Sequence, residues 1–411
     1  MRAMLAPLSV PTFRRVWLGQ VANVVGDAVY AVAIALYLLP RPDAPRALGL
    51  VLGMAALGGV VSLLVGGVLA DWYRRSVVII VSDVVRAAAV AGILFVGQDA
   101  PLWSLGALAA LLGIGSGLYR PAYGAILPSL VPREMLPGAN GLRSLVNRVG
   151  VIVGAAVGGA LAGATSPGWA LAVDMATFLV SIATLVGVHE DAPRARDRAD
   201  RSLVADVGDG LRYVFSRPWM AGIMLQGTAQ MALVAAPVAL LLPLLTGPQG
   251  WFGWITAAEA VGAFAGASAG ASVRTRSRGW LAMLALFAQL PQTVALALHA
   301  PPLVILLASV LTGGGLATFA VVWTTALQTG VPREQLGRVF SVDQLAVAGL
   351  MPVGFVMAGW LLDGIGQSAL AWLATVALAA SILAVLPLPG LRRLTDEPRA
   401  GVAEPVPNLA S

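Results

Sequence analysis

The chain has 411 residues, of which 58% are hydrophobic and 11% charged, and its mean hydropathy is +0.84. A soluble domain carries roughly 25% charged residues, so lipid must solvate much of this chain, and the net charge of +6 does not indicate nucleic-acid binding. All 26 basic residues are arginine and there is no cysteine, which excludes disulfides, thiolate metal sites and a P-loop that needs a lysine.

A helix needs roughly 20 apolar residues to cross the hydrocarbon core of a bilayer. Runs of this size, separated by polar breaks, predict an all-α membrane protein with twelve transmembrane helices. The predicted spans cover residues 16–39, 47–70, 77–97, 102–126, 142–164, 168–188, 219–245, 251–272, 279–299, 302–327, 340–363 and 367–388.

Arginines divide the polar breaks into two classes. In the predicted topology nearly all loop arginines, including Arg14, Arg74 and Arg333, lie on one side of the membrane. Only Arg41 and Arg46 lie in loops on the other side. Cytoplasmic loops carry an excess of basic residues. Both termini and the central polar segment are therefore predicted to be cytoplasmic.

The central segment is the one polar stretch long enough to be a linker. Its second part places Leu203, Val207 and Leu211 at the spacing of an amphipathic helix lying on the membrane. The predicted organisation is a six-helix half over residues 1–189, a cytoplasmic central loop over 190–217, a second six-helix half over 218–390 and a cytoplasmic tail over 391–411.

The sequence repeats itself at an offset of 200 residues. Val131-Pro132-Arg133-Glu134 returns as Val331-Pro332-Arg333-Glu334, and Leu145, Val153, Gly154, Gly159 and Leu161 recur as Leu345, Val353, Gly354, Gly359 and Leu361. Two homologous halves in an apolar chain are typical of a transporter whose pathway lies between the repeats.

Charged side chains inside the predicted spans are functional candidates, because each costs at least about 2.5 kcal/mol at mid-bilayer. They are Asp27, Asp83, Arg86, Arg120, Asp174 and Glu259. The i,i+3 spacing of Asp83 and Arg86 predicts a structural ion pair. Asp174 is close enough to the non-cytoplasmic end of its span to reach the headgroups by snorkelling, and a structural role there competes evenly with a functional one.

Four polar residues at i, i+3, i+7 and i+10 share one face of the first span. They are Gln20, Asn23, Asp27 and Tyr30. Because lipid cannot satisfy such a face, it is predicted to line an aqueous pathway. The other predicted cavity residues are Gln226, Gln230, Gln289 and Trp323.

Two acids are predicted to bind protons or cations. Asp27 belongs to the polar face of the first span, and Glu259 lies near the middle of the eighth with no base nearby in the sequence. Arg120 cannot release its proton, and it is predicted to serve as a fixed positive partner for an acid or for an anionic substrate.

Asp71 closes the predicted second span, where its carboxylate can meet Arg75 or the N-terminal end of a neighbouring helix. A contact that forms in one conformation and breaks in the other would act as a gate latch, and the alternative is that these charges serve topology only. On the fifth span, Gly150, Gly154 and Gly158, with Gly159 beside them, allow a close helix approach. Tight packing and a hinge role are both open for them.

Several short motifs are spread over residues 12 to about 390. They are Gly67-Val68-Leu69-Ala70-Asp71 followed by Arg75, Phe13-Arg14-Arg15, Gly26-Asp27, Arg120-Pro121-Ala122, Leu127-Pro128, Ala139-Asn140 and Gly337-Arg338-Val339-Phe340-Ser341. Together they resemble the major facilitator superfamily, and within it the branch of proton-driven drug and siderophore exporters. The sequence departs from the family's loop signature at Trp72, Arg74 and Ser76, and Ala155 stands where its antiporter signature has proline.

The resemblance implies the major facilitator fold, twelve helices in two pseudo-symmetric halves, in a bacterial inner (plasma) membrane. The predicted function is export of amphipathic small molecules in exchange for protons, by a monomer without cofactor, metal or catalytic residues. Its predicted partners are the small-molecule substrate, protons and the lipid bilayer, not nucleic acid. The alternatives are an uncoupled facilitator, an importer of a small metabolite, or a membrane receptor or subunit without transport activity.

Overall fold

The structure is a computed structural model that describes residues 2–188, 190, 203–272 and 278–388. These residues form helices and connecting turns, without a strand among them. The first half contains α1 (Arg2–Leu5), a short 3-10 turn η1 (Ala6–Ser9), α2 (Pro11–Leu38), α3 (Ala44–Trp72), α4 (Arg75–Val96), α5 (Leu102–Leu130), η2 (Arg133–Met135), α6 (Leu136–Ala164) and α7 (Pro167–Leu185).

The second half has the same six spans, three of them interrupted. After α8 (Leu203–Phe215), which belongs to the central segment, it contains α9 (Pro218–Gln230), a π-helical turn η3 (Met231–Ala235), α10 (Ala236–Thr246), α11 (Phe252–Ser272), α12 (Arg278–Leu286), η4 (Phe287–Gln289), α13 (Leu290–Ala297), α14 (Pro302–Gly330), α15 (Arg333–Ala348) and α16 (Met351–Val385). Helix α8 occupies the position predicted for the amphipathic helix of the central segment.

Twelve spans follow from these helices. Ten segments of the described chain are long and apolar enough to cross a membrane, and the last of them, Gln335–Val385, has 51 residues. At about 1.5 Å per residue this is far longer than one crossing, and it divides at Gly366, whose φ of 81° breaks the helix. With the 21-residue α11, the predicted twelve-helix architecture is confirmed.

Proline marks where many of these helices begin. It opens α2, α7, α9 and α14, at Pro11, Pro167, Pro218 and Pro302. At a first helical position proline loses no hydrogen bond, and its fixed φ suits the helix. The connections between the helices within each half are short, so consecutive spans run antiparallel to one another.

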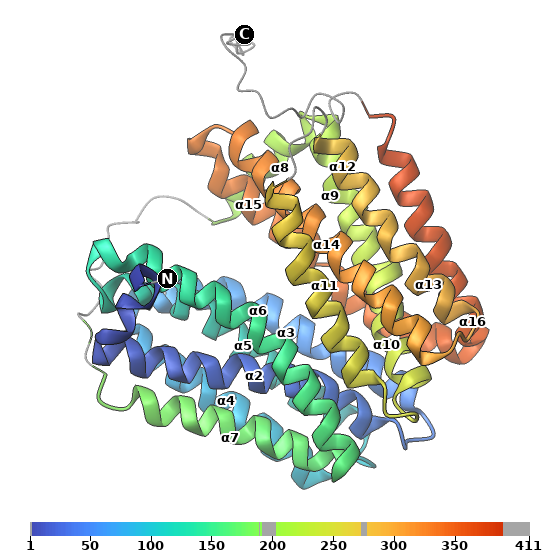
Figure 1. Cartoon of the computed structure of the whole chain (residues 1–411), viewed down its shortest axis with the longest axis horizontal. Coiled ribbons are helices and arrows are strands. Elements are labelled where there is room, and N and C mark those ends of the chain that lie inside the picture. Colours follow the sequence, from blue (N-terminus) through green and yellow to red (C-terminus); the bar gives the residue numbers. More distant parts are fainter. Residues whose placement is uncertain (1, 189, 191–202, 273–277, 389–411) are drawn as a thin grey trace.

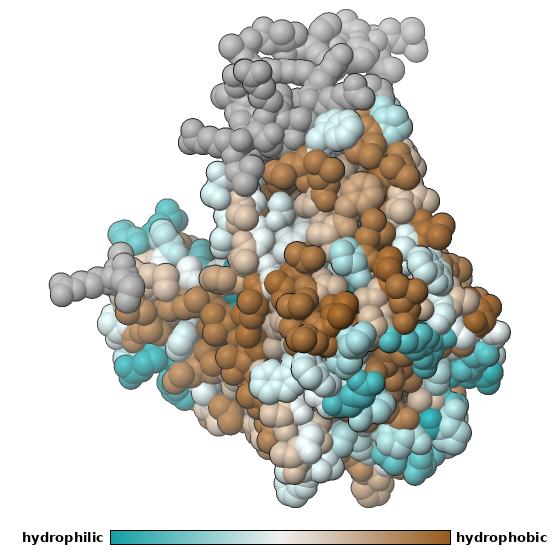
Figure 2. Space-filling model, turned by 45° about the vertical axis from the view of Figure 1, so that its right-hand side comes forward, coloured by the Kyte–Doolittle hydropathy of each residue, from teal (hydrophilic) through white to brown (hydrophobic). Residues whose placement is uncertain are grey.

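The outer surface of the helices is apolar. Large hydrophobic side chains such as Phe95, Leu307 and Val376 are exposed, and Figure 2 shows hydrophobic residues over much of the visible face. Five exposed tryptophans gather at the same end of the helices: Trp103, Trp169, Trp254, Trp360 and Trp372. Tryptophan favours the interface between lipid and water, so this end of the helices lies at one membrane surface.

The two halves meet at one end and diverge at the other (Figure 1). Helix α3 packs against α16, and α6 packs against α11. Glycines make these contacts close, since a Cβ on Gly253 would lie 2.5 Å from the Cα of Gly159, and one on Gly49 would lie 3.1 Å from the Cα of Gly359. We call this end, with the turns at residues 39–43, 165–166, 247–251 and 366, the closed face. The opposite end, which carries α1, α8 and the turn at residues 73–74, is the open face.

The sequence repeat is visible as a structural repeat. On α5, Tyr119 and Tyr123 stack with ring centroids 5.6 Å apart, and on α14 their counterparts Phe319 and Trp323 stack at 6.5 Å. The neighbouring helices contact each of these pairs differently. Arg143 of α6 lies over the Tyr123 ring, with its guanidinium carbon 5.5 Å from the ring centroid.

Candidate functional site

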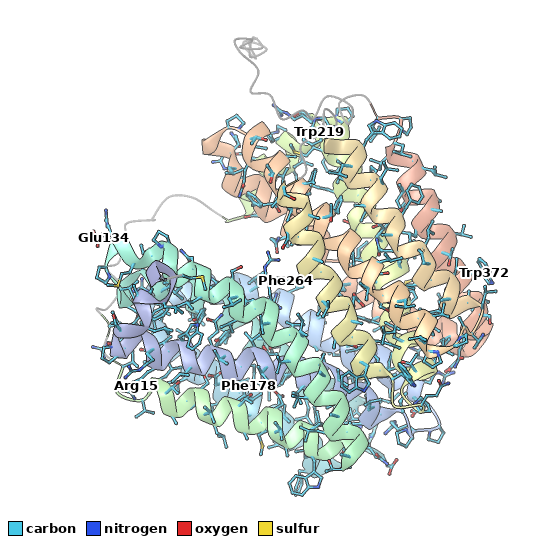
Figure 3. All side chains as sticks on the ribbon, viewed as in Figure 1. Arg15, Glu134, Phe178, Trp219, Phe264 and Trp372 are labelled. Carbon is cyan, nitrogen blue, oxygen red and sulfur yellow. The ribbon has the colours of Figure 1, made fainter. Side chains whose placement is uncertain are left out.

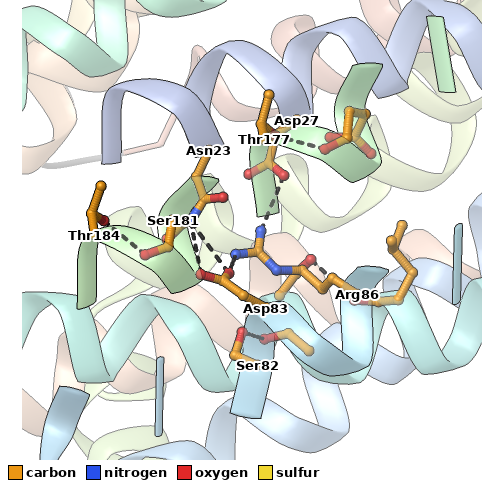
Figure 4. A network of polar contacts seen from close by, with 12 residues as sticks. Asn23, Asp27, Ser82, Asp83, Arg86, Thr177, Ser181 and Thr184 are labelled. Carbon is orange, nitrogen blue, oxygen red and sulfur yellow. Dashed lines mark hydrogen bonds and ion pairs between the residues drawn. The ribbon is translucent and has the colours of Figure 1, made fainter. Parts of the chain in front are cut away.

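An ion-paired cluster lies inside the first half, at the middle of α2 (Figure 4). Arg86 of α4 donates from Nη1 to Oδ1 of Asp27 at 3.1 Å, and from Nη2 to Oδ1 of Asp83, one turn away on its own helix. The Arg86 side chain is 1% exposed, whereas that of Asp27 is 52% exposed. A carboxylate cannot face lipid at this depth without a large cost, so we infer that its exposed edge opens on the space between the halves.

The buried side of the cluster is satisfied by neighbouring helices. Asn23 of α2 donates from Nδ2 to the Asp83 carboxylate at 3.3 and 3.4 Å and to Oγ of Ser181 on α7 at 3.1 Å. The guanidinium carbon of Arg86 lies 4.3 Å from the ring centroid of Phe178, which Figure 3 labels within the first half, and 4.7 Å from that of Tyr119. These contacts stabilise a buried arginine that would otherwise be costly.

The predicted Asp83–Arg86 pair is present, but it is not isolated. Arg86 joins it to Asp27, 59 residues away in the sequence. The charge of Arg120 on α5 also acts on Asp27, and the Arg120 side chain is exposed. Two helices, α2 and α4, therefore place two acids and one buried arginine at a point where the charge of a second arginine, on α5, also acts.

The polar face of α2 points mostly into the half instead of into an aqueous pathway. Gln20 and Asn23 are buried, and Gln20 donates to Oδ1 of Asn147 at 3.3 Å and accepts a hydrogen bond from the hydroxyl of Tyr123. The prediction that this whole face lines the pathway is wrong, because Gln20 and Asn23 are buried and hydrogen-bonded to residues of the same half. Asp27 is the member of the face that is exposed.

The same correction applies to the other predicted cavity residues. Gln226, Gln230, Gln289 and Trp323 are all buried. Gln230 donates to Oγ of Ser381 at 2.9 Å, and Trp323 Nε1 donates to Oδ1 of Asp343 at 2.8 Å. In this conformation they pack inside the second half.

Glu259 lies beside a cavity of about 400 Å³ between the halves. The lining residues are Val151 of α6 together with Thr256, Glu259, Ala260, Ala263, Gly313, Leu316 and Ala317 of α11 and α14. The side chain of Gln292, on α13, acts on the Glu259 carboxylate, and its amide donates to Oγ of Ser309 at 2.7 Å. Glu259 is therefore the acid of the second half that opens on this inter-half cavity.

The predicted latch is only partly described. The side chain of Asp71 lies outside the described residues, and Arg75 is partly buried at the first residue of α4. The backbone N–H of Ser76, in the first turn of α4, donates to Oε1 of Glu190 at 2.7 Å. A carboxylate at this position stabilises the positive end of α4. Glu190, which follows α7, is therefore hydrogen-bonded to the N-terminus of α4, the helix that follows Asp71.

The glycines of α6 serve two different contacts. Gly150, Gly154 and Gly158 pack against Val24, Val25 and Val29 of α2 within the first half. Gly159 instead faces Gly253 of α11 in the second half. Gly150, Gly154 and Gly158 therefore allow α6 to pack closely within its own half, and Gly159 allows the two halves to come into contact.

Three features of this region are not among the predictions from the sequence. Asp343 is the buried partner of Trp323. Arg148 lies inside the fifth span, and its side chain is exposed. The third is the polar seam of α7, whose residues Asp174, Thr177, Ser181 and Thr184 recur every three or four positions, a spacing that places them on one helix face.

Residues 2–409 match the family of transmembrane secretion effectors, a branch of the major facilitator superfamily. The chain belongs to this family. It is 24% identical over 380 residues to macrolide efflux protein A of Streptococcus pyogenes, covering 86% of this chain and 90% of that protein. It is 29% identical over 347 residues to the enterobactin exporter of Escherichia coli, covering 80% of each.

The fold of this transporter family is also found in solved structures. A bacterial homologue of the human lysosomal transporter Spinster, in an inward-facing and unoccupied conformation, aligns with a TM-score of 0.66 at 18% identity. The alignment covers 91% of this chain and 94% of that one. The resemblance to major facilitator exporters is thereby confirmed, and the protein is a multi-pass membrane transporter of a bacterial inner membrane.

Proposed function

We propose that this transporter exports amphipathic small molecules from the cytoplasm by alternating access, as a monomer and in exchange for protons. The observation that carries the proposal is the Asp27–Arg86–Asp83 cluster. It has one half-exposed carboxylate, ion-paired to an arginine that is otherwise buried. Such a carboxylate can bind a proton only by weakening its ion pair, which links protonation to the packing of α2 and α4.

The open face is assigned to the cytoplasm. The arginines at its turns, including Arg14 and Arg74, favour that side of the membrane. On this assignment the structure is inward-open, with the closed face sealing the outer side. Asp27 and the Glu259 cavity would then be reached from the cytoplasm, and Asp71 would pair only after the halves rock to the outward-open state.

Mixed surroundings support an amphipathic substrate. The cavity beside Glu259 combines an acid with apolar walls such as Val151 and Leu316, and Arg120 adds a positive charge near Asp27. The two relatives are named for chemically different substrates, a macrolide and enterobactin. We therefore assign a substrate class by size and amphipathicity and not by a single chemical group.

The experiment is efflux of a chemically diverse panel from cells that overproduce the chain, with and without a protonophore. Export of at least one compound that stops when the proton gradient is dissipated supports the proposal. Efflux that is insensitive to the protonophore would contradict proton exchange and favour an uncoupled facilitator. Accumulation in place of efflux would reverse the direction.

A further inference from the structure

Asp174 of α7 is a carboxyl group without a hydrogen-bond donor. Its side chain is 0% exposed, and neither Oδ1 nor Oδ2 has a partner among the described residues. A buried polar group without a partner is costly, and a buried charge without one is far more costly. The predicted snorkelling of Asp174 to the headgroups is wrong, because the side chain is completely buried where α7 packs against the neighbouring helices.

Close packing between α2 and α7 creates this enclosure. A Cβ on Gly26 would lie 2.8 Å from Oδ1 of Asp174, so the glycine makes room for the carboxyl group. The hydroxyl of Thr177 donates to the backbone oxygen of Asp174 at 2.7 Å and is not directed to the carboxyl group. The hydroxyl of Tyr30 is likewise buried without a partner among the residues that the structure describes.

Few charges act on Asp174. Those that do are Asp27 on α2 and Arg86 on α4, and Asp174 acts in turn on the Tyr30 hydroxyl. The third helix packed against α7 is α6, and no charged residue of α6 is among the groups that act on Asp174. Asp174 therefore belongs electrostatically to the cluster around Arg86, although it makes no hydrogen bond with it.

The charges of this cluster cancel when Asp174 is neutral. Asp27 and Asp83 are matched by Arg86, which contacts both, and by Arg120, whose charge acts on Asp27. An ionised Asp174 would add one unmatched negative charge beside Asp27. At the same time, Nε of Arg86 is a buried donor without an acceptor among the described residues, so Arg86 has an unused donor and Asp174, on which its charge acts, has an unused acceptor.

We propose that Asp174 is a second proton-binding residue, which carries the proton in the inward-open state and exchanges it with Asp27 during transport. In the exchange the O–H bond of Asp174 breaks and one forms on the Asp27 carboxylate. Asp174, now ionised, accepts a hydrogen bond from Nε of Arg86, while neutral Asp27 leaves its ion pair with Nη1. The total charge is unchanged, and Asp27 passes the proton to water through its exposed edge.

This inference rests on the proposed proton exchange, and it makes Arg86 a switch between two acids. In this scheme Asp27 exchanges the proton with water in the space between the halves, and the buried Asp174 holds the proton behind it. The proton would stay bound to Asp174 while Asp27 is ion-paired with Arg86. The substrate would then bind next to the Asp27–Arg86 ion pair and not next to an unpaired charge.

Infrared spectroscopy of the purified full-length protein in liposomes tests the protonation directly. At neutral pH the wild type should show the carbonyl band of a protonated carboxylic acid. This band should lose intensity in Asp174→Asn and keep it in Asp27→Asn. Asp43→Asn is the matched control, because hydrogen bonds from Arg41 hold the pKa of Asp43 below its usual range and keep it ionised. A spectrum unchanged by Asp174→Asn would overturn the proposal.

Transport in the same liposomes tests the exchange. Asp174→Asn should lose substrate movement driven by a proton gradient and the pH dependence of transport, while downhill exchange continues, and Asp174→Glu should recover part of the driven transport. An Asp174→Asn protein with wild-type driven transport would overturn the proposal, as would dependence on a sodium gradient that disappears in this variant. If the wild type itself shows no proton-driven transport, the proposed function fails, and the infrared result still decides whether Asp174 holds a proton.

Discussion

Arg46 on α3 and Asp363 on α16 form an ion pair across the two halves at the closed face. The Arg46 guanidinium carbon also lies 4.7 Å from the centroid of the Trp360 ring. Both charged side chains are partly exposed, so water screens the pair. Because the partners lie on different halves, the contact must break whenever this face opens, and it stabilises only the conformation described here.

Asp363→Asn should shift the protein toward the state in which the closed face is open. An exposed ion pair contributes up to about 1 kcal/mol, which corresponds to roughly a five-fold change in the ratio of the two states. Spin labels on introduced cysteines, one in each half, measure this ratio in a chain that has no native cysteine. Exchange of the two charges, Arg46→Asp with Asp363→Arg, should restore it, and identical distance distributions in Asp363→Asn and wild type would contradict the role.

Gly253→Leu should prevent the halves from meeting. Its side chain would enter the space of Gly159, whose Cα lies 2.5 Å from the position of the new Cβ, and forced overpacking costs about 1–3 kcal/mol. The same label pair should report loss of the closed conformation, and transport should fall with it. Gly163→Leu is the control on α6, since nothing lies within 4 Å of a Cβ there. Equal effects of both variants would show that steric contact between the halves is not the cause.

Asp71→Asn should leave insertion and folding intact and reduce turnover. If Asp71 pairs only in the outward-open state, its loss removes a charged hydrogen bond worth about 1.5–3 kcal/mol and slows conformational exchange without weakening substrate binding. Initial rates and binding isotherms on the same preparation separate the two effects. Full turnover at normal expression would rule out the latch.

Asp27→Asn should abolish uphill efflux and permit downhill exchange, because the cavity remains while the exposed acid beside Arg86 can no longer take a proton. Glu259→Gln should do the same, or should selectively lose cationic substrates if that acid recognises substrate charge. Proton movement in oriented vesicles on substrate addition measures the coupling. A double variant that still concentrates substrate, with unchanged pH dependence, would remove both residues from the mechanism.

A reporter fused after Arg201 should be cytoplasmic, and one inserted near Asp43 should be external. The prediction follows from the arginines of the open face and assigns the inward-open state. Enzymatic reporters that are active on only one side of the membrane measure it. A central segment accessible from outside the cell would invert the assignment of both faces.

The amino-acid sequence by itself determined the spans, the two halves and the family. A chain in lipid must satisfy its backbone within each helix, so every crossing leaves an apolar run of characteristic length. The internal repeat, from Val131 to Leu161 and again from Val331 to Leu361, carries the pseudo-symmetry. The positions of Asp27 and Glu259 in apolar helices also marked them as candidates before any contact was known.

Only the tertiary structure decided which residues meet. Helical periodicity places Asn23 and Asp27 on the same side of α2, but it cannot tell whether that side faces water or another helix of the same half. Asn23 is buried against Asp83 and Ser181, while Asp27 is half exposed and paired with Arg86. The enclosure of Asp174 depends equally on how closely α7 approaches Gly26. Such contacts join residues far apart in the chain, and packing geometry, which local sequence does not encode, determines them.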